Sequence, residues 1–124
     1  NRKARYQLRQ TRKSIEQVQM RFQSQLEGVA LEVRAAVRAV EAARQRVEST
    51  RAQTEYEAAK LEAEIKRYEN GISTSQDVLD FQEDLALARS SYLKALVDYN
   101  QAIIDLERAR GAILEKNGII EDQK

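Results

Sequence analysis

The sequence contains no proline, cysteine, histidine or tryptophan, and only 4 glycines in 124 residues. Histidine and cysteine are absent, and neither a glycine-rich phosphate loop nor a nucleophile beside a base occurs, so no catalytic constellation can be assembled from the sequence. We therefore expect no enzymatic activity, with no catalytic residue, no cofactor-binding residue and no metal site.

Aromatic residues make up only 6% of the chain, and no apolar run approaches the about 20 residues that a membrane-spanning helix needs. The net charge of +1 argues against nucleic acid as a general partner. The chain starts at Asn1 rather than at a methionine and shows no signal-like segment, so we expect a piece of a longer protein.

What is abundant is charge, at 33% of residues, together with alanine, leucine and glutamine. This composition is typical of long helices and coiled coils. We predict an all-α fold, a single long antiparallel helical hairpin with one very long helix and one shorter helix. Two helices enclose no sizeable core, so we expect this hairpin to be a fragment or an oligomer, or else to gain only marginal stability from its seam.

The dipeptide Asn70-Gly71 separates two helical patterns that mirror each other. Upstream, apolar or small residues recur about every 3.5 residues, the period of a left-handed supercoil. Folding the chain back at the glycine pairs Val47 with Tyr99, and the numbers of every such pair add to 146. The two rows are Val33, Val37, Val40, Ala43, Val47, Thr54, Ala58, Leu61, Ile65 and Tyr68, and Val78, Phe81, Leu85, Ala88, Tyr92, Tyr99, Ile103, Leu106, Ala109 and Ile113.

The element boundaries follow from the turn chemistry. We expect a helix over about 5–70, a tip turn over 70–75, a second helix over about 76–116 and a short tail over 117–124. Gly71 supplies the left-handed residue of a C-cap, and Ser73 with Gln76 has capping-box spacing. Asn117-Gly118 is expected to end the second helix in the same manner.

The unequal helix lengths leave most of residues 1–29 without partners in this register. Apolar residues nevertheless continue there, at Leu8, Ile15, Val18, Phe22 and Leu26. Their partner must come from another segment or another chain, and we expect the isolated chain to self-associate weakly. Gly28 marks either a close neighbour or a tolerated glycine, and the basic run over 2–13 is either a solvated helix end or a lipid-binding patch.

The downstream helix carries a second apolar row, roughly a quarter-turn or more from the first. It comprises Leu79, Leu87, Leu93, Val97 and Ile104. A hairpin needs one seam, whereas a helix in a closed ring needs one on each flank. The row therefore indicates ring packing, or else ordinary exposed leucines on a long helix.

The stretch Tyr68-Glu-Asn-Gly-Ile-Ser-Thr-Ser-Gln-Asp-Val-Leu-Asp80 resembles the TolC-like outer-membrane efflux proteins. Repeats in that family carry a Tyr-x-x-Gly turn followed by Asp-Val-Leu-Asp at this spacing. The likeness continues through Leu85, Ala88-Arg89, Tyr92, Asp98-Tyr99 and Leu106 to Gly111, and it covers roughly residues 30–115.

The resemblance implies a fragment of a trimeric α-barrel, most like the family's second repeat. Family members are homotrimeric tunnels for multidrug efflux and type I secretion, with a periplasmic α-barrel below an outer-membrane β-barrel that this chain lacks. It implies as partners a periplasmic adaptor protein and an inner-membrane transporter, with no nucleic acid. The implied location is the cell outer membrane of a Gram-negative bacterium, with this segment in the periplasm.

The same resemblance implies that the tip residues Tyr68, Gly71, Ser73, Asp77 and Asp80 form the tunnel entrance. Tyr68 matches a tyrosine in links that hold the entrance closed, and the two aspartates match acids that line it as rings. An arginine of that closing network falls at Ser73, where this chain departs from the family. The residues alone leave other interpretations open: Tyr68 as part of the seam, and both aspartates as helix-start residues that favour the helix dipole.

Two other functions compete with the channel. A periplasmic adaptor hairpin would carry an Arg-x-x-x-Leu-x-x-x-x-x-x-Ser pattern at its tip, whereas Arg89 and Leu93 lie far from the turn and Asn100 occupies the serine position. A coiled-coil scaffold or membrane-curving dimer would show a concave basic face, whereas bases and acids are intermixed beyond residue 13.

Overall fold

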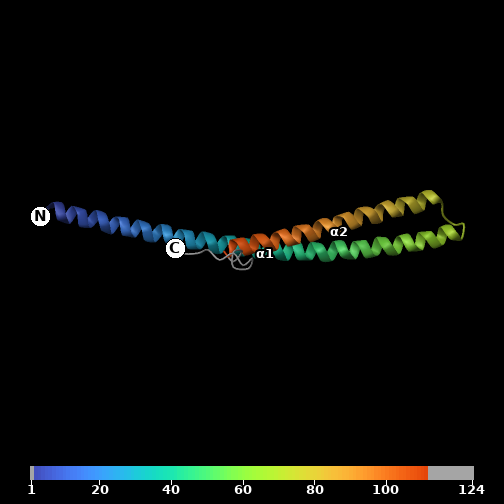
Figure 1. The fold of residues 1–124 in the computed structure, drawn as a ribbon, viewed down its shortest axis with the longest axis horizontal. Helices are drawn as coiled ribbons and strands as arrows, with labels where there is room; N and C mark the ends of the chain where they lie inside the picture. Colours follow the sequence, from blue (N-terminus) through green and yellow to red (C-terminus); the bar gives the residue numbers. More distant parts are fainter. Residues whose placement is uncertain (1, 112–124) are drawn as a thin grey trace, which may run out of the picture. The chain divides into compact units, whose positions relative to one another are not determined.

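A computed structural model describes residues 2–111, which form two α-helices and contain no strand (Figure 1). Helix α1 spans Arg2–Glu69 and α2 spans Ser75–Ala109. The chain divides into two compact units, residues 1–35 and 36–124, which are described separately. The all-α helical hairpin predicted from the sequence is confirmed.

The second unit contains the hairpin. After the turn, α2 runs back along α1, and the two helices pack against each other (Figure 1). The most deeply buried apolar residues of the described part lie on α2: Leu85, Ala88 and Ala95, which expose 6%, 4% and 2% of their surfaces. Half-buried residues extend this seam on both helices, among them Val40, Val47, Leu61, Phe81, Tyr92, Tyr99 and Leu106.

On α1 the buried face differs from the predicted row. Val37, Ala58, Ile65 and Tyr68 are exposed, so their assignment to the seam is wrong. The other predicted residues, Val33, Val40, Ala43, Val47, Thr54 and Leu61, do lie on the half-buried face. The structure adds Ala36, Thr50, Glu57 and Glu64, which with Ala43 form a row with a strict spacing of seven residues. Two glutamates can occupy this face because each finds a polar partner there, as described below.

The end of α2 also differs from the expectation. The helix ends at Ala109 rather than at about residue 116, with Arg110 as its C-cap. Gly111 follows with φ of +70°, the left-handed conformation that glycine adopts without steric cost and that terminates helices. The expected stop at Asn117-Gly118, the tail over 117–124 and the pairing of Ile113 lie outside the described residues.

The outer row, as we name it here, lies on the opposite side of α2 from the seam. Leu79 and Val97 each lie nine residues, about two and a half turns, from the buried Ala88. Ile104 lies nine residues from the buried Ala95, so it likewise points away from α1. The row consists of Leu79, Ala86, Ser90, Leu93, Val97 and Ile104, all exposed. Leu87, which was predicted to belong to it, is also exposed but flanks the row, and Ala86 and Ser90 occupy the positions between Leu79 and Leu93.

In the first unit, every residue from 2 to 32 is exposed. Leu8, Ile15, Val18, Phe22 and Leu26 expose 53–63% of their surfaces. A Cβ added at Gly28 would meet nothing within 4 Å, so this glycine marks no close approach within the described chain.

Candidate functional site at the hairpin tip

The end of α1 is closed by two backbone hydrogen bonds across the turn. The amide of Ile72 donates to the carbonyl of Arg67, and the amide of Gly71 donates to that of Tyr68, both at 2.9 Å. This pair of bonds defines a Schellman motif, which requires a left-handed residue at the position of Gly71. Gly71 has φ of +72°, so the glycine predicted to end the helix does so.

Helix α2 begins with a capping box formed by Thr74 and Asp77. The Asp77 amide donates to Thr74 Oγ1 at 3.2 Å, and the Thr74 amide donates to Asp77 Oδ2 at 2.9 Å. The expected box of Ser73 with Gln76 is therefore wrong by one residue. The threonine takes the cap because Asp77 can return a charge-assisted hydrogen bond to its amide.

Ser73 is left free to connect the two helices. Its hydroxyl lies within hydrogen-bonding distance of Glu64 Oε1 on α1 and of Asp77 Oδ2 on α2, the latter at 3.3 Å. Glu64 is 5% exposed, and its other oxygen accepts from Arg67 Nη1 at 3.1 Å. Four side chains, Glu64, Arg67, Ser73 and Asp77, thus form one polar cluster, which we call the tip cluster.

The hydrogen bonds around Asp77 lower the pKa of its carboxylate. The hydroxyl of Thr74 donates to its carboxylate at 2.6 Å, and this bond is the largest cause of a lowered pKa at Asp77. The Thr74 amide, the Ser73 hydroxyl and the positive charge of Arg67 lower the pKa of Asp77 further. The carboxylate is therefore charged over the whole neutral range.

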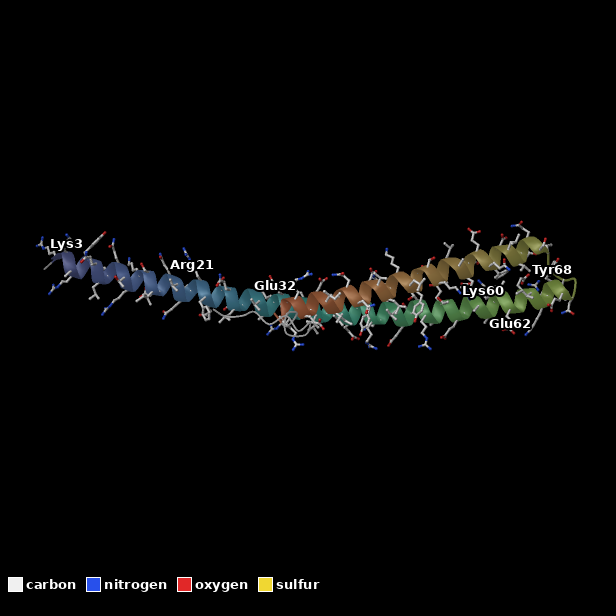
Figure 2. All side chains as sticks on the ribbon, viewed as in Figure 1. Lys3, Arg21, Glu32, Lys60, Glu62 and Tyr68 are labelled. Atoms are coloured by element: carbon white, nitrogen blue, oxygen red, sulfur yellow. The ribbon has the colours of Figure 1, made fainter. Side chains whose placement is uncertain are left out.

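The remaining tip residues lie outside this cluster. Asp80 is exposed and accepts a hydrogen bond from Gln76 Nε2 at 2.8 Å. Tyr68 lies in the last turn of α1 at the tip end of the hairpin and is 48% exposed (Figure 2). The structure therefore joins Ser73 with Asp77 through side chains and leaves Tyr68 and Asp80 on the surface.

A second polar cluster lies farther along the seam, around Lys60 (Figure 2). Lys60 Nζ is 2.8 Å from Glu57 Oε2 and 4.0 Å from Asp84 Oδ2 on the facing helix. It also lies 4.9 Å from the ring centroid of Phe81, within cation–π distance. The hydrogen bond with Glu57 is the main cause of a raised pKa at Lys60.

Sequence reasoning missed Glu64 and Lys60, because charged residues were read as solvated and only apolar or small residues were placed in the seam. A signal was present for Glu64. It continues the seven-residue spacing of Ala36, Ala43 and Thr50, and a strict spacing identifies a helix face whatever residues occupy it.

Within residues 2–111, no cluster of acidic side chains is arranged to hold a metal ion. No helix in that range is both long and apolar enough to cross a membrane. Compared with known proteins, the chain matches no family model, no curated protein and no solved structure. What can be said of its function therefore rests on its own residues and on the resemblance of the turn.

Proposed function

We propose that this chain is a periplasmic, tunnel-forming segment of an outer-membrane efflux or secretion channel. The tip of the hairpin forms the tunnel entrance and the docking surface for a periplasmic adaptor protein and an inner-membrane transporter. The complete channel is a homotrimer in the outer membrane of a Gram-negative bacterium. The chain catalyses no reaction and contributes walls, an entrance and contact surfaces.

The observation that carries the proposal is that α2 has two apolar faces. One is the seam with α1, and the other is the outer row, on which Leu93 and Val97 expose 61% and 66% of their surfaces. A helix in an isolated hairpin needs one apolar face, whereas a helix in the wall of a closed barrel packs against a neighbour on each side. The Asn-Gly turn and the Asp-Val-Leu-Asp segment after it favour the TolC-like family among such barrels.

The tip residues have separate roles in the proposed entrance. Gly71, Ser73 and Asp77 fix the turn, because their bonds hold the end of α1 and the start of α2. Tyr68 and Asp80 are the exposed groups, and they face a neighbouring chain or the lumen in the trimer. Threefold symmetry makes each aspartate a ring of three carboxylates, which attracts cations.

The test is the ion selectivity of the complete channel in a planar bilayer. Replacing Asp80 with asparagine should lower cation selectivity and its dependence on ionic strength, because the exposed carboxylate ring is lost. The double variant Asp77→Asn/Asp80→Asn should lower both further. Asparagine retains the size of aspartate and a side-chain oxygen that can still accept from the Thr74 amide, so the turn should persist, although it is less stable than in the parent.

The matched control is Asp105→Asn, which removes the same charge near the other end of α2. It should leave selectivity as in the parent. If the double variant and the control behave alike, the two aspartates serve only to start the helix, and the entrance is wrongly assigned.

A further inference from the structure

The outer row belongs to a longer regular pattern on the exposed face of α2. Between Leu79 and Ile104 the positions on this face alternate four and three residues apart, with Glu83 and Asn100 completing the row. This is the spacing of an antiparallel coiled-coil seam. Within the described residues, the hairpin covers none of these eight positions, all of which are exposed.

We propose that this face binds a second copy of the same chain, with the two α2 helices antiparallel about a twofold axis between Ser90 and Leu93. This inference goes beyond the channel function and concerns the chain when it is not part of a ring. Both arrangements use the outer row, so they exclude each other.

The residues of the row fit one another when one copy is reversed. In the register where paired numbers add to 183, Leu79 faces Ile104 of the second copy, so two large side chains close each end of the seam. Near the axis, the small Ala86 and Ser90 face the larger Val97 and Leu93. Large residues opposite small ones fill a helix–helix seam evenly, whereas a parallel pairing sets Ala86 against Ala86 and Ser90 against Ser90.

Charge also selects the antiparallel arrangement. The first part of α2 carries Asp77, Asp80, Glu83 and Asp84 and no base before Arg89. A parallel pairing would set Glu83, which lies on the row within this acidic part, directly opposite Glu83 of the second copy, and this like-charge contact is unfavourable. The reversed copy instead presents residues 99–106, which carry a single acid, Asp105, and places Asn100 opposite Glu83.

The residues that flank the row raise no conflict. In an antiparallel pair, flanking positions on the same side of the two helices meet. This brings Leu87 beside the aliphatic part of Lys94 and Asp80 beside Gln101, with no pair of like charges. Leu87, which is 61% exposed in the single chain, gains cover in the same step.

The register is tested by disulfide formation between two single-cysteine variants of the full chain, which has no cysteine of its own. Leu79→Cys and Ile104→Cys are mixed, unfolded, refolded together and oxidised. Positions 79 and 104 on one helix are about 38 Å apart, so no bond can form within a chain. The mixture should give at least about fivefold more linked dimer than either variant alone, because only mixed dimers juxtapose the two cysteines.

Sedimentation across a concentration series tests the surface. Leu93→Ser/Val97→Ser should weaken dimerisation at least about tenfold, since both side chains lie near the twofold axis. Ile15→Ser/Phe22→Ser is the matched control on the exposed apolar face of the first unit and should leave the dimer intact. Both pairs are exposed, so neither should disturb the hairpin seam.

Three results would overturn the proposal: a monomer at every concentration, linked dimers of Leu79→Cys alone at the level of the mixture, or dissociation by the Ile15/Phe22 variant and not by the Leu93/Val97 variant. The first excludes the dimer, the second makes it parallel, and the third assigns it to the other unit. None of them bears on the ion selectivity of the complete channel, so the two proposals fail separately.

Discussion

The carboxylate of Asp77 carries out two tasks with the same oxygen. Oδ2 accepts from the amide and the hydroxyl of Thr74, which begins α2, and it lies 3.3 Å from the hydroxyl of Ser73, which connects the turn to α1. All of these bonds are stronger with a charged acceptor. The start of α2 therefore depends on one ionised group, which also lies beside the hydroxyl that reaches α1.

That dependence predicts a pH effect on stability. The pKa of Asp77 is lowered from 3.8 in the folded chain, so its contribution to the free energy of unfolding is complete above the ordinary aspartate pKa. It is lost as the pH falls through the lowered value. Chemical denaturation should show the parent more stable than Asp77→Asn at neutral pH, with the difference disappearing in strong acid.

Thr74→Ala provides the control for this profile. Without the hydroxyl, the largest cause of the lowered pKa is gone, so the acid-dependent part of the stability should shrink. Loss of the capping hydroxyl should lower the free energy of unfolding by about 1 kcal/mol. A pH-independent difference between the parent and Asp77→Asn would mean that the capping box does not depend on the charge.

At the scale of the elements, the sequence was sufficient for the hairpin and the turn but not for the details of the seam. Asn70-Gly71 fixes the end of α1, because only a left-handed residue completes that motif. The one-residue error at the cap arose because Ser73 and Thr74 both offer a hydroxyl; Thr74 forms the box with Asp77, and Ser73 lies within hydrogen-bonding distance of Glu64. A contact between residues nine positions apart, across a turn, is not visible in local spacing.

Alanine substitutions at Gly28 in α1 and at Gly71 in the turn should change the stability of the chain in opposite directions. Gly28→Ala should stabilise the helix by about 0.5–1 kcal/mol, because the new Cβ meets nothing within 4 Å and alanine has less freedom to lose. Gly71→Ala should cost about 1–2 kcal/mol, because its φ of +72° is strained for any residue with a side chain. Thermal unfolding followed by circular dichroism measures both, and equal effects would contradict the assigned conformations.

The 146 register remains a prediction that disulfide formation can test. Lys60 contacts Asp84 at 4.0 Å, and the numbers of these two residues add to 144. This differs from 146 by two residues, a distance that a long lysine side chain can span, so the contact agrees with the register. Val47→Cys/Tyr99→Cys should form an intramolecular disulfide readily, because both positions lie on the half-buried seam. Val47→Cys/Asp105→Cys should not form one. If the second pair forms a disulfide and the first does not, α2 is shifted along α1 by more than a turn from the predicted register.

At the scale of the whole chain, burial is unevenly distributed. Residues 2–32 are exposed throughout, whereas the second unit contains all the buried residues of the described part. An isolated helix without tertiary contacts is marginal in water. The two parts of the same helix α1 therefore differ in what stabilises them.

Hydrogen exchange at low protein concentration should register this difference. Amides over 78–106 should exchange at least about tenfold more slowly than those over 5–30, because the seam must open before they exchange. Ile15→Ser/Phe22→Ser should leave the protection of 78–106 unchanged. Equal protection in both ranges would mean that the apolar face over residues 8–29 is covered.

The hydroxyl of Ser73 carries one proton and lies beside two carboxylates, so at any instant it donates to Glu64 or to Asp77. Turning about a single bond, Cβ–Oγ, changes the acceptor and with it the helix to which the turn is tied. Such rotations take picoseconds to nanoseconds. Two bonding patterns are thus open to the Ser73 hydroxyl with the same backbone, and a partner that removes either carboxylate from reach would hold it in one of them.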